Sequence, residues 1–289
     1  MNEKIAIIVV TYNPNINELK SNINTYYKQS GIIILVDNSN SIEISTSVID
    51  TFKNYNKMHI ITLGNNYGIA YAQNVGIKFA IEKNYKYFIE MDQDSKLFEN
   101  YVQHIYSSYV AIQKKGNKIA GIGPIAFNKK DNSQYHSRNS NSEIIEVDKT
   151  LSSGFLTSLE AINTVGLKNE DLFIDLVDWE WCWRARSLEY KTYVDTKLKL
   201  PHMLGEGHKN FLFFKLGIPA PIRHYYQYRN ALLLNKMKHV PFKWKIKRTL
   251  IHLLKPILFF CFYDKRIERF KYIIKGIKDG ILGKSGKIN

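Results

Sequence analysis

Residues 4–40 read KIAIIVVTYNPNINELKSNINTYYKQSGIIILVDNSN, and this stretch decides the fold. Two short apolar runs, 4–10 and 32–36, are rich in β-branched residues and flank the longer segment 15–30. A continuously apolar run of this length is typical of a strand buried on both faces of a parallel sheet. The pattern therefore predicts a strand, a helix over 15–30 and a second, parallel strand.

The same alternation continues along the chain. We expect helices over 43–55 and 69–83 and strands over 58–63 and 87–91. Strands that alternate with helices form a mostly parallel sheet flanked by helices, an α/β fold of Rossmann-like type. Binding sites in such sheets lie in the crevice at the carboxyl ends of the strands. The polar groups expected there are Thr11-Tyr12-Asn13, Asp37 and Asp92-Gln93-Asp94.

The sequence after residue 99 is less regular. The stretch 128–142 is rich in Asn and Ser and predicts a surface loop or hairpin. We expect one catalytic domain over 1–215 and a helical, basic region over 216–289. The other elements expected are helices over 100–114, 159–165 and 179–189 and a strand over 118–123.

Composition and cysteine usage exclude several classes of protein. The chain has 289 residues, 45% of them apolar, which is enough for a packed core and excludes disorder. Cys182 and Cys261 have no metal-ligand spacing around them, so we expect neither a disulfide framework nor a structural zinc site, and a reducing compartment. No apolar run reaches the roughly 20 residues of a membrane span, and the first is too short for a signal peptide.

The net charge of +15 is concentrated at one end of the chain. Residues 236–289 hold 15 Lys and Arg against three acidic residues, which leaves a nearly neutral body. This asymmetry indicates a polyanionic partner, either nucleic acid or an anionic membrane surface, unless it is simply a solvated basic helix.

Few sequence motifs indicate a particular catalytic or binding chemistry. P-loop, dinucleotide-binding, GxSxG and HExxH patterns are absent. Asp92-Gln93-Asp94 places two carboxylates two residues apart on extended chain, where they can share one hard divalent cation with a diphosphate. Alone, this pattern also fits an ordinary acidic turn.

The motifs taken together resemble the inverting family 2 glycosyltransferases, which have a GT-A fold, over roughly residues 4–215. Val10-Thr11-Tyr12-Asn13-Pro14 and Val36-Asp37-Asn38-Ser39 are similar to the family's first two strand motifs, and 66–76 matches its NxGxAxAxNxG segment. Asp37 would then accept a hydrogen bond from the imide of a uracil or thymine base. Most positions in 66–76 would only pack a helix on the sheet. The implied donor contacts are Thr11, Tyr12, Asn13, Asp37, Asn66, Gly68, Asn74, Gln93, Ser153, Gly154, Trp179 and Glu180.

The resemblance also implies metal and catalytic roles. Asp92, Asp94 and His202 would hold Mg²⁺ or Mn²⁺, with His208 as a competitor for the histidine. The stretch 178–185 resembles the family's acidic motif, although Val177 replaces its usual Glu. It aligns Asp178 with the general base and Glu180 with a second acid. Asp175 could share either role, and Asp178 would also serve as a helix N-cap.

Weaker motifs at 223–230 and 276–280 resemble those of one subgroup of the family, the rhamnosyltransferases. The resemblance thus implies an inverting transfer of a sugar in bacterial surface polysaccharide synthesis. The sugar would be L-rhamnose from dTDP-rhamnose, and a UDP-sugar is the second choice of donor. The acceptor would be a saccharide or lipid-linked saccharide. Of the three tryptophans at 179, 181 and 183, Trp179 would face the sugar and the other two the core.

Apolar residues spaced by three and four within 244–262, mixed with lysines, are typical of a helix lying in a membrane interface. We therefore expect a cytoplasmic enzyme, peripheral on the inner face of the cell membrane and without a nucleic-acid partner. Alternatively, the terminal helices pack on the body or on a second subunit of a homodimer. Two other hypotheses are a non-catalytic membrane- or nucleic-acid-binding protein and a sugar nucleotidyltransferase, but the latter would need a Gly-rich loop after the first strand.

Overall fold

The structure is a computed structural model that describes residues 4–128, 142–202, 208–211, 214–217, 219–262 and 264–288. Side chains are described over the same ranges except 128, 202, 208–217, 257–258 and 260–262. Most of the predicted loop 128–142, and the side chains of His202 and His208, therefore lie outside the described residues.

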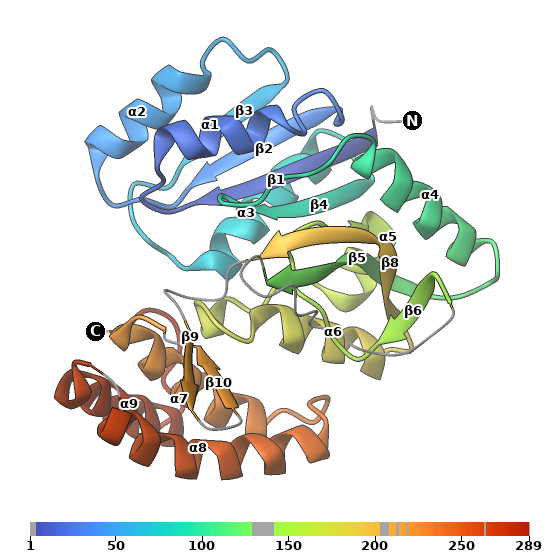
Figure 1. The fold of residues 1–289 in the computed structure, drawn as a ribbon. Coiled ribbons are helices and arrows are strands. Elements are labelled where there is room, and N and C mark those ends of the chain that lie inside the picture. The colour runs from blue at the N-terminus through green and yellow to red at the C-terminus, as the bar shows by residue number, and fades with distance from the viewer. Residues whose placement is uncertain are drawn as a thin grey trace.

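An eight-stranded sheet forms the centre of the molecule, in the order β3-β2-β1-β4-β7-β5-β8-β6 (Figure 1). β1 pairs in parallel with both β2 and β4, and β2 pairs in parallel with β3. Only β7 and β6 run against their neighbours, so the predicted, mostly parallel sheet is confirmed. The strands are β1 (Ile5–Thr11), β2 (Ile32–Asp37), β3 (Met58–Thr62), β4 (Tyr87–Asp92), β5 (Ile119–Asn128), β6 (Ile144–Val147), β7 (Phe155–Ser158) and β8 (Lys191–His202).

Helices cover both faces of the sheet because successive side chains of a strand point to opposite faces. Ile5, Ile7 and Val9 of β1 pack in one core with α1 (Ile16–Asn24), α2 (Ile42–Phe52) and α4 (Tyr101–Gln113). Ala6 and Ile8 pack in a second core with α3 (Ile69–Glu82), α5 (Leu159–Val165) and α6 (Val177–Ser187).

Three helices follow the sheet domain: α7 (Pro221–Asn235), α8 (Phe242–Phe262) and α9 (Arg266–Ile281), which confirms the helical character of this region (Figure 1). A short hairpin of β9 (His208–Phe211) and β10 (Phe214–Gly217) precedes them. Leu234 of α7 and Val240 share a buried cluster with Val177 and Trp183 of α6. The helical region is therefore packed directly on the sheet domain.

Several element boundaries differ from the sequence predictions, and the largest extension is that of β5, which continues to Asn128 instead of ending at residue 123. α1 ends at Asn24 instead of residue 30, because Thr25 turns the chain and its hydroxyl hydrogen-bonds the Asn22 carbonyl oxygen at 2.7 Å. α6 begins at Val177, two residues earlier than predicted. The strands β6 and β8 were not predicted, because β8 is largely polar and charged and because β6, Ile-Ile-Glu-Val, is only four residues long.

Gly76 lets α3 approach the sheet closely. A Cβ atom at this position would lie 2.5 Å from Cγ2 of Ile8 and 3.2 Å from Cγ2 of Val36. Helix propensity alone predicts that Gly76→Ala stabilises the protein by about 1 kcal/mol. The overlap with two buried strands costs about 1–3 kcal/mol and outweighs that gain.

We therefore expect Gly76→Ala to lower the free energy of unfolding, measured by chemical denaturation. Lys78→Ala, on the exposed side of the same helix, is the matched control and should change stability by less than about 0.5 kcal/mol. A stabilised Gly76→Ala variant would show that α3 is not tightly packed on the sheet.

Candidate active site

Two adjoining cavities lie at the carboxyl ends of β1 and β4. The first, about 470 Å³, is lined by Asn38, Asn40 and Asn66, and we call it the asparagine cavity. The second, about 440 Å³, is lined by carboxylates, and we call it the carboxylate cavity. Residues common to both linings are Ile69, Asp92, Gln93, Ile174 and Arg223.

Gln93 joins the ends of β1 and β4 at the floor of the asparagine cavity. Its Oε1 accepts a hydrogen bond from the Tyr12 N–H at 2.8 Å, and its Nε2 donates to the Tyr12 carbonyl at 3.4 Å. The Tyr12 ring is 43% exposed and lines the cavity. The structure thus brings two of the predicted donor-binding residues together.

Asp37 and Thr11 are fully buried and line neither cavity, and the base contact expected of Asp37 stays a prediction. The Asp37 carboxylate accepts hydrogen bonds from the hydroxyls of Thr11 at 3.1 Å, Ser39 at 2.6 Å and Ser45 at 2.5 Å. Its acceptor capacity is therefore used inside the protein. Asn13, also predicted to bind the donor, is exposed outside both cavity linings.

The neighbouring Asn38 lines the cavity instead. Its Oδ1 accepts a hydrogen bond from the Tyr67 N–H at 2.9 Å, and its Nδ2 donates to Asn66 at 3.1 Å. Asn66 in turn accepts from the Gly68 N–H at 3.0 Å. Gly68 has φ +92°, and a Cβ there would lie 2.6 Å from Phe173, so the loop requires glycine.

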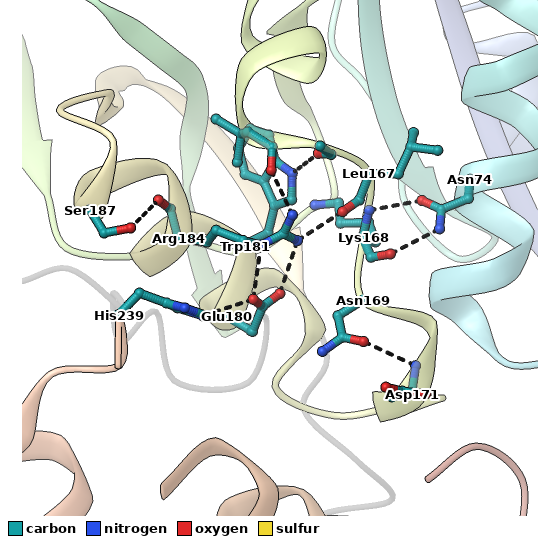
Figure 2. Close-up of polar contacts among 12 residues, drawn as sticks. Asn74, Leu167, Lys168, Asn169, Asp171, Glu180, Trp181, Arg184, Ser187 and His239 are labelled. Atoms are coloured by element: carbon teal, nitrogen blue, oxygen red, sulfur yellow. Dashed lines mark hydrogen bonds and ion pairs between the residues drawn. The ribbon is translucent and has the colours of Figure 1, made fainter. Parts of the chain in front are cut away.

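Asn74 lies away from both cavities and has a structural role (Figure 2). Its amide accepts from the Lys168 N–H and donates to the Lys168 carbonyl, both at 2.9 Å. This arrangement agrees with the expectation that much of the 66–76 segment only packs the helix.

Four carboxylates, those of Asp92, Asp94, Asp175 and Asp178, line the carboxylate cavity. Burial, together with the charges of Asp94, Asp178 and Glu90, raises the pKa of Asp92 to about 7, and the charge of Arg223 opposes them. Asp92 and Asp94 supply the hard oxygen ligands that Mg²⁺ or Mn²⁺ takes together with substrate phosphates. Among the residues that the structure describes, no group of three or more His, Cys, Asp and Glu side chains forms a metal site.

A buried lysine, which the sequence analysis missed, lies behind these carboxylates. Lys168 Nζ is 3.1 Å from Oε2 of Glu90 and 3.9 Å from Oδ1 of Asp178. Burial lowers the pKa of Lys168, but the charges of Glu90 and Asp178 outweigh burial and leave it raised. A glutamate within the apolar strand YFIEMD was the available signal that a buried cation must lie nearby.

Asp178 lies in the first turn of α6, but it is not the N-cap that was expected. Leu176 occupies that position with φ 67° and makes no side-chain capping bond. The Asp178 carboxylate is 25% exposed and accepts a hydrogen bond from the Ser152 N–H at 3.3 Å. It therefore faces the cavity with two positive groups nearby, the helix N-terminus and Lys168.

Glu180 points away from both cavities (Figure 2). Its carboxylate is buried and accepts hydrogen bonds from Arg184 Nε at 2.9 Å and Nη2 at 3.1 Å, with His239 Nε2 at 2.9 Å. Burial raises the pKa of Glu180, but hydrogen bonds from His239 and Arg184 outweigh burial and lower it. The Glu180 carboxylate therefore links α6 with the α7–α8 connection, and its expected donor contact stays a prediction.

Ser153 and Gly154 support the site from behind. The Ser153 hydroxyl accepts from the Asp92 N–H at 3.3 Å and donates to Ser95 at 2.8 Å, and the Gly154 N–H donates to the Glu90 carbonyl at 2.8 Å. Neither residue lines a cavity, whereas the adjacent Ser152 does.

Two arginines from the helical region complete the carboxylate cavity, and neither was predicted to bind a ligand. Arg223 donates to both oxygens of Asp175, at 2.8 and 2.5 Å. Burial lowers the pKa of Arg223, but the Asp175 charge outweighs burial and leaves it raised. Arg248 of α8 lines the same cavity. In the sequence, Arg223 stood out only as part of the weak motif at 223–230.

Trp179 lines the carboxylate cavity, with Lys149 Nζ 4.3 Å from its ring centre. Trp181 and Trp183 are buried, at 1% and 2% exposure, which confirms their expected place in the core. His202 ends β8, where its backbone pairs with Asn128, and its predicted metal contact is untested because its side chain lies outside the described residues.

Comparison with known proteins identifies the fold. The model of "Glycosyl transferase family 2" matches residues 6–167. A "dTDP-rhamnosyl transferase RfbF" of Shigella flexneri is 33% identical over 300 residues, which is 99% of this chain and 98% of the relative. GalNAc-T7, solved with UDP, GalNAc and Mn²⁺, aligns with a TM-score of 0.58 at 14% identity, over 89% of this chain and 57% of its own.

S. aureus TarS aligns with a TM-score of 0.55 at 15% identity, over 96% of this chain and 49% of its own. The chain thus spans about half the length of these two structures, and the likeness to them concerns the fold alone. The matching family model, the rhamnosyl transferase relative and the fold shared with these structures make the chain a glycosyltransferase enzyme of GT-A type. The chain belongs to glycosyl transferase family 2.

The raised pKa of Asp92 predicts how metal-free stability depends on pH. An unfolded aspartate titrates near 3.9, roughly, so the folded state binds more protons than the unfolded state between that pH and about 7. Stability of the metal-free protein should therefore fall as pH rises through this window.

Asp92→Asn removes this charge, so in EDTA at pH 8 the variant should be more stable than the wild type by about 1–3 kcal/mol, with little difference at pH 4. Chemical denaturation at the two pH values is the measurement. Asp50→Asn, at an exposed position on α2, is the control and should leave both curves unchanged. Equal stability of wild type and Asp92→Asn at pH 8 would contradict the repulsion among the site carboxylates.

Proposed function

We propose that this enzyme transfers L-rhamnose from dTDP-L-rhamnose, with inversion, to a saccharide or lipid-linked saccharide in bacterial surface polysaccharide synthesis. The proposal is supported by the similarity to the Shigella rhamnosyl transferase over nearly the whole of both chains. A UDP-sugar donor is the alternative, because uracil and thymine present the same imide.

The observation that carries the proposal is the junction of the two cavities at Asp92, Gln93 and Arg223. A nucleotide in the asparagine cavity would have its diphosphate at this junction and its sugar in the carboxylate cavity, beside Trp179. Arg223 offers guanidinium donors that suit phosphate oxygens. A divalent cation held by Asp92 and Asp94 would offset charge on the leaving diphosphate.

Asp178 is the proposed general base. In an inverting transfer, an acceptor hydroxyl attacks the anomeric carbon from the face opposite the nucleotide, and a carboxylate takes its proton. Asp178 lines the cavity, and among the described residues its carboxylate accepts a long 3.3 Å bond from the Ser152 N–H and lies 3.9 Å from Lys168 Nζ. Asp175, the other candidate, is engaged by Arg223 through both of its oxygens.

Asp178→Asn should therefore lower rhamnose transfer by about 100-fold or more, because general-base catalysis contributes factors of this size. Binding of dTDP, measured by calorimetry, should change little, since the amide preserves the shape of the side chain. The assay measures transfer from dTDP-rhamnose and from a panel of UDP-hexoses, each with Mn²⁺ and with EDTA.

Asp175→Asn is the matched control, and a larger loss there would transfer the role of base to Asp175. An active Asp178→Asn enzyme would refute the assignment of the base. If the enzyme turned over UDP-hexoses and not dTDP-rhamnose, the proposed rhamnose donor would be refuted, but the assignment as a glycosyltransferase would stand. Full activity in EDTA would refute the proposed role of the metal.

We also propose that α8 and α9 seat the enzyme on an anionic membrane, on the cytoplasmic face. No helix in the described part of the chain is long and apolar enough to cross a membrane. Along α8, large apolar side chains 48–74% exposed recur at spacings of three and four, and exposed lysines lie beside them at 243 and 247. This combination of apolar surface and positive charge fits an anionic lipid interface. The exposed apolar residues of α8 are Phe242, Ile246, Leu250, Leu253 and Leu254.

The double change Leu250→Glu with Leu253→Glu should abolish flotation with vesicles rich in phosphatidylglycerol at low salt, because it places two charges in the apolar stripe. Ile42→Glu with Ile49→Glu, on exposed positions of α2, is the matched control and should float like the wild type. A wild type that stays at the bottom would refute the membrane proposal. In that case, size-exclusion chromatography tests the alternative partner. If the wild type were a dimer and the α8 variant a monomer, the partner of α8 would be a second subunit.

A further inference from the structure

The segment after α9 returns to the catalytic body and forms one wall of the asparagine cavity. Lys287 and Ile288 line this cavity together with Tyr12, Asn38 and Asn66, which lie more than 200 positions earlier in the chain. The Gly286 N–H donates to the Asp171 carbonyl at 2.8 Å, and the Ile288 N–H donates to the Tyr226 hydroxyl at 3.1 Å. The backbone of this segment is therefore fixed on both sides of Lys287.

A buried arginine anchors the same segment. The Arg229 guanidinium donates to the Gly286 carbonyl and, at 3.0 Å, to the carbonyl of Leu172. Arg229 has 0% exposure, and its bond to Leu172 is buried while its bond to Gly286 is partly buried. One side chain therefore sets the position of Lys287 relative to the turn that carries Phe173, another residue of the cavity wall.

Lys287 presents a charge that a ligand can use. Two cationic side chains line the described wall of this cavity, and one of them, Arg223, is paired with Asp175. Lys287 Nζ contacts a neutral amide oxygen, that of Asn65, at 3.1 Å on the surface. An anionic or strongly polarised oxygen makes a stronger hydrogen bond with an ammonium group than a neutral, solvated amide does.

The position of Lys287 indicates which part of a nucleotide it can reach. Asn65 lies three residues beyond the end of β3, whereas Asp92 ends β4, and the order β3-β2-β1-β4 puts three strand spacings, about 14 Å, between these two strands. This separation is far beyond hydrogen-bond reach. A diphosphate at Asp92 and Asp94 therefore leaves Lys287 to the other end of the nucleotide.

We propose that Lys287 binds the nucleoside portion of the donor, through an oxygen of the base or of the deoxyribose. This inference rests on the proposed function, in which the asparagine cavity holds the nucleotide. It makes the segment after α9 part of the donor site and Lys287 a determinant of donor affinity.

The test is calorimetric binding of dTMP and dTDP, each with and without Mn²⁺, to the full chain. Lys287→Met should weaken both ligands by about tenfold, and equally in the presence and absence of Mn²⁺, because a hydrogen bond to a charged group is lost at a site remote from the metal. Lys287 is exposed, so the variant should fold as the wild type does. Lys278→Met, at an exposed position on α9 with the same change of charge, is the matched control and should bind both nucleotides normally.

Unchanged affinity in Lys287→Met would overturn the inference, and so would a loss confined to dTDP, which would place Lys287 at the second phosphate. An equal loss in Lys278→Met would overturn it as well, since general charge would then explain the effect. If the wild type bound neither dTDP nor UDP, the proposed function itself would fail, which is a distinguishable result.

Discussion

The repulsion among carboxylates at the ends of β4 and α6 is the constraint on which this site depends. Glu90, Asp92, Asp94 and Asp178 lie close together, and burial of Asp92, with the charges of the other three, raises its pKa. Lys168 offsets part of this repulsion from behind, at 3.1 Å from Glu90. Removing one partner of such a buried pair costs about 3–5 kcal/mol, whereas a pair of apolar residues could fill the same space without that risk. The arrangement is therefore better explained by the chemistry of the cavity than by stability.

The loop that presents Asp175 is a second costly feature, and the helical region stabilises it. Phe173, Asp175 and Leu176 have φ between 61° and 68°, a conformation that non-glycine residues rarely adopt. The Asn230 amide donates to the carbonyls of Leu172, Ile174 and Asp175 at 2.8–2.9 Å. The boundary predicted near residue 215 stays a prediction, yet the site crosses it, because the cavity walls include side chains from α7, α8 and the segment after α9.

The sequence predicted the parts of the site that depend on local order. Apolar runs placed β1 and β4, and strand ends then gave Tyr12, Gln93 and the pair Asp92 and Asp94. Local order along the chain does not show which of the predicted residues face the cavity. Asp37 and Glu180 are carboxylates at the expected positions in the sequence, but donors inside the protein hydrogen-bond them. The cations were missed for another reason: Lys168, Arg223, Arg248 and Lys287 reach the site through tertiary packing, and no spacing along the chain encodes that approach.

On the membrane proposal, the two sides of α8 connect the lipid surface with the cavity. At about 100° per residue, the exposed apolar side chains from Phe242 to Leu254 fall within an arc of about 120°, and Arg248 lies on the opposite side of the helix. Arg248 lines the carboxylate cavity, so a single helix, about 10 Å across, would separate the membrane from the reacting groups. A sugar carried on a lipid would then need to rise only a short distance to reach Asp178. The same geometry would favour an acceptor with few sugar residues between its lipid and its attacking hydroxyl, because a longer chain would carry that hydroxyl past the cavity.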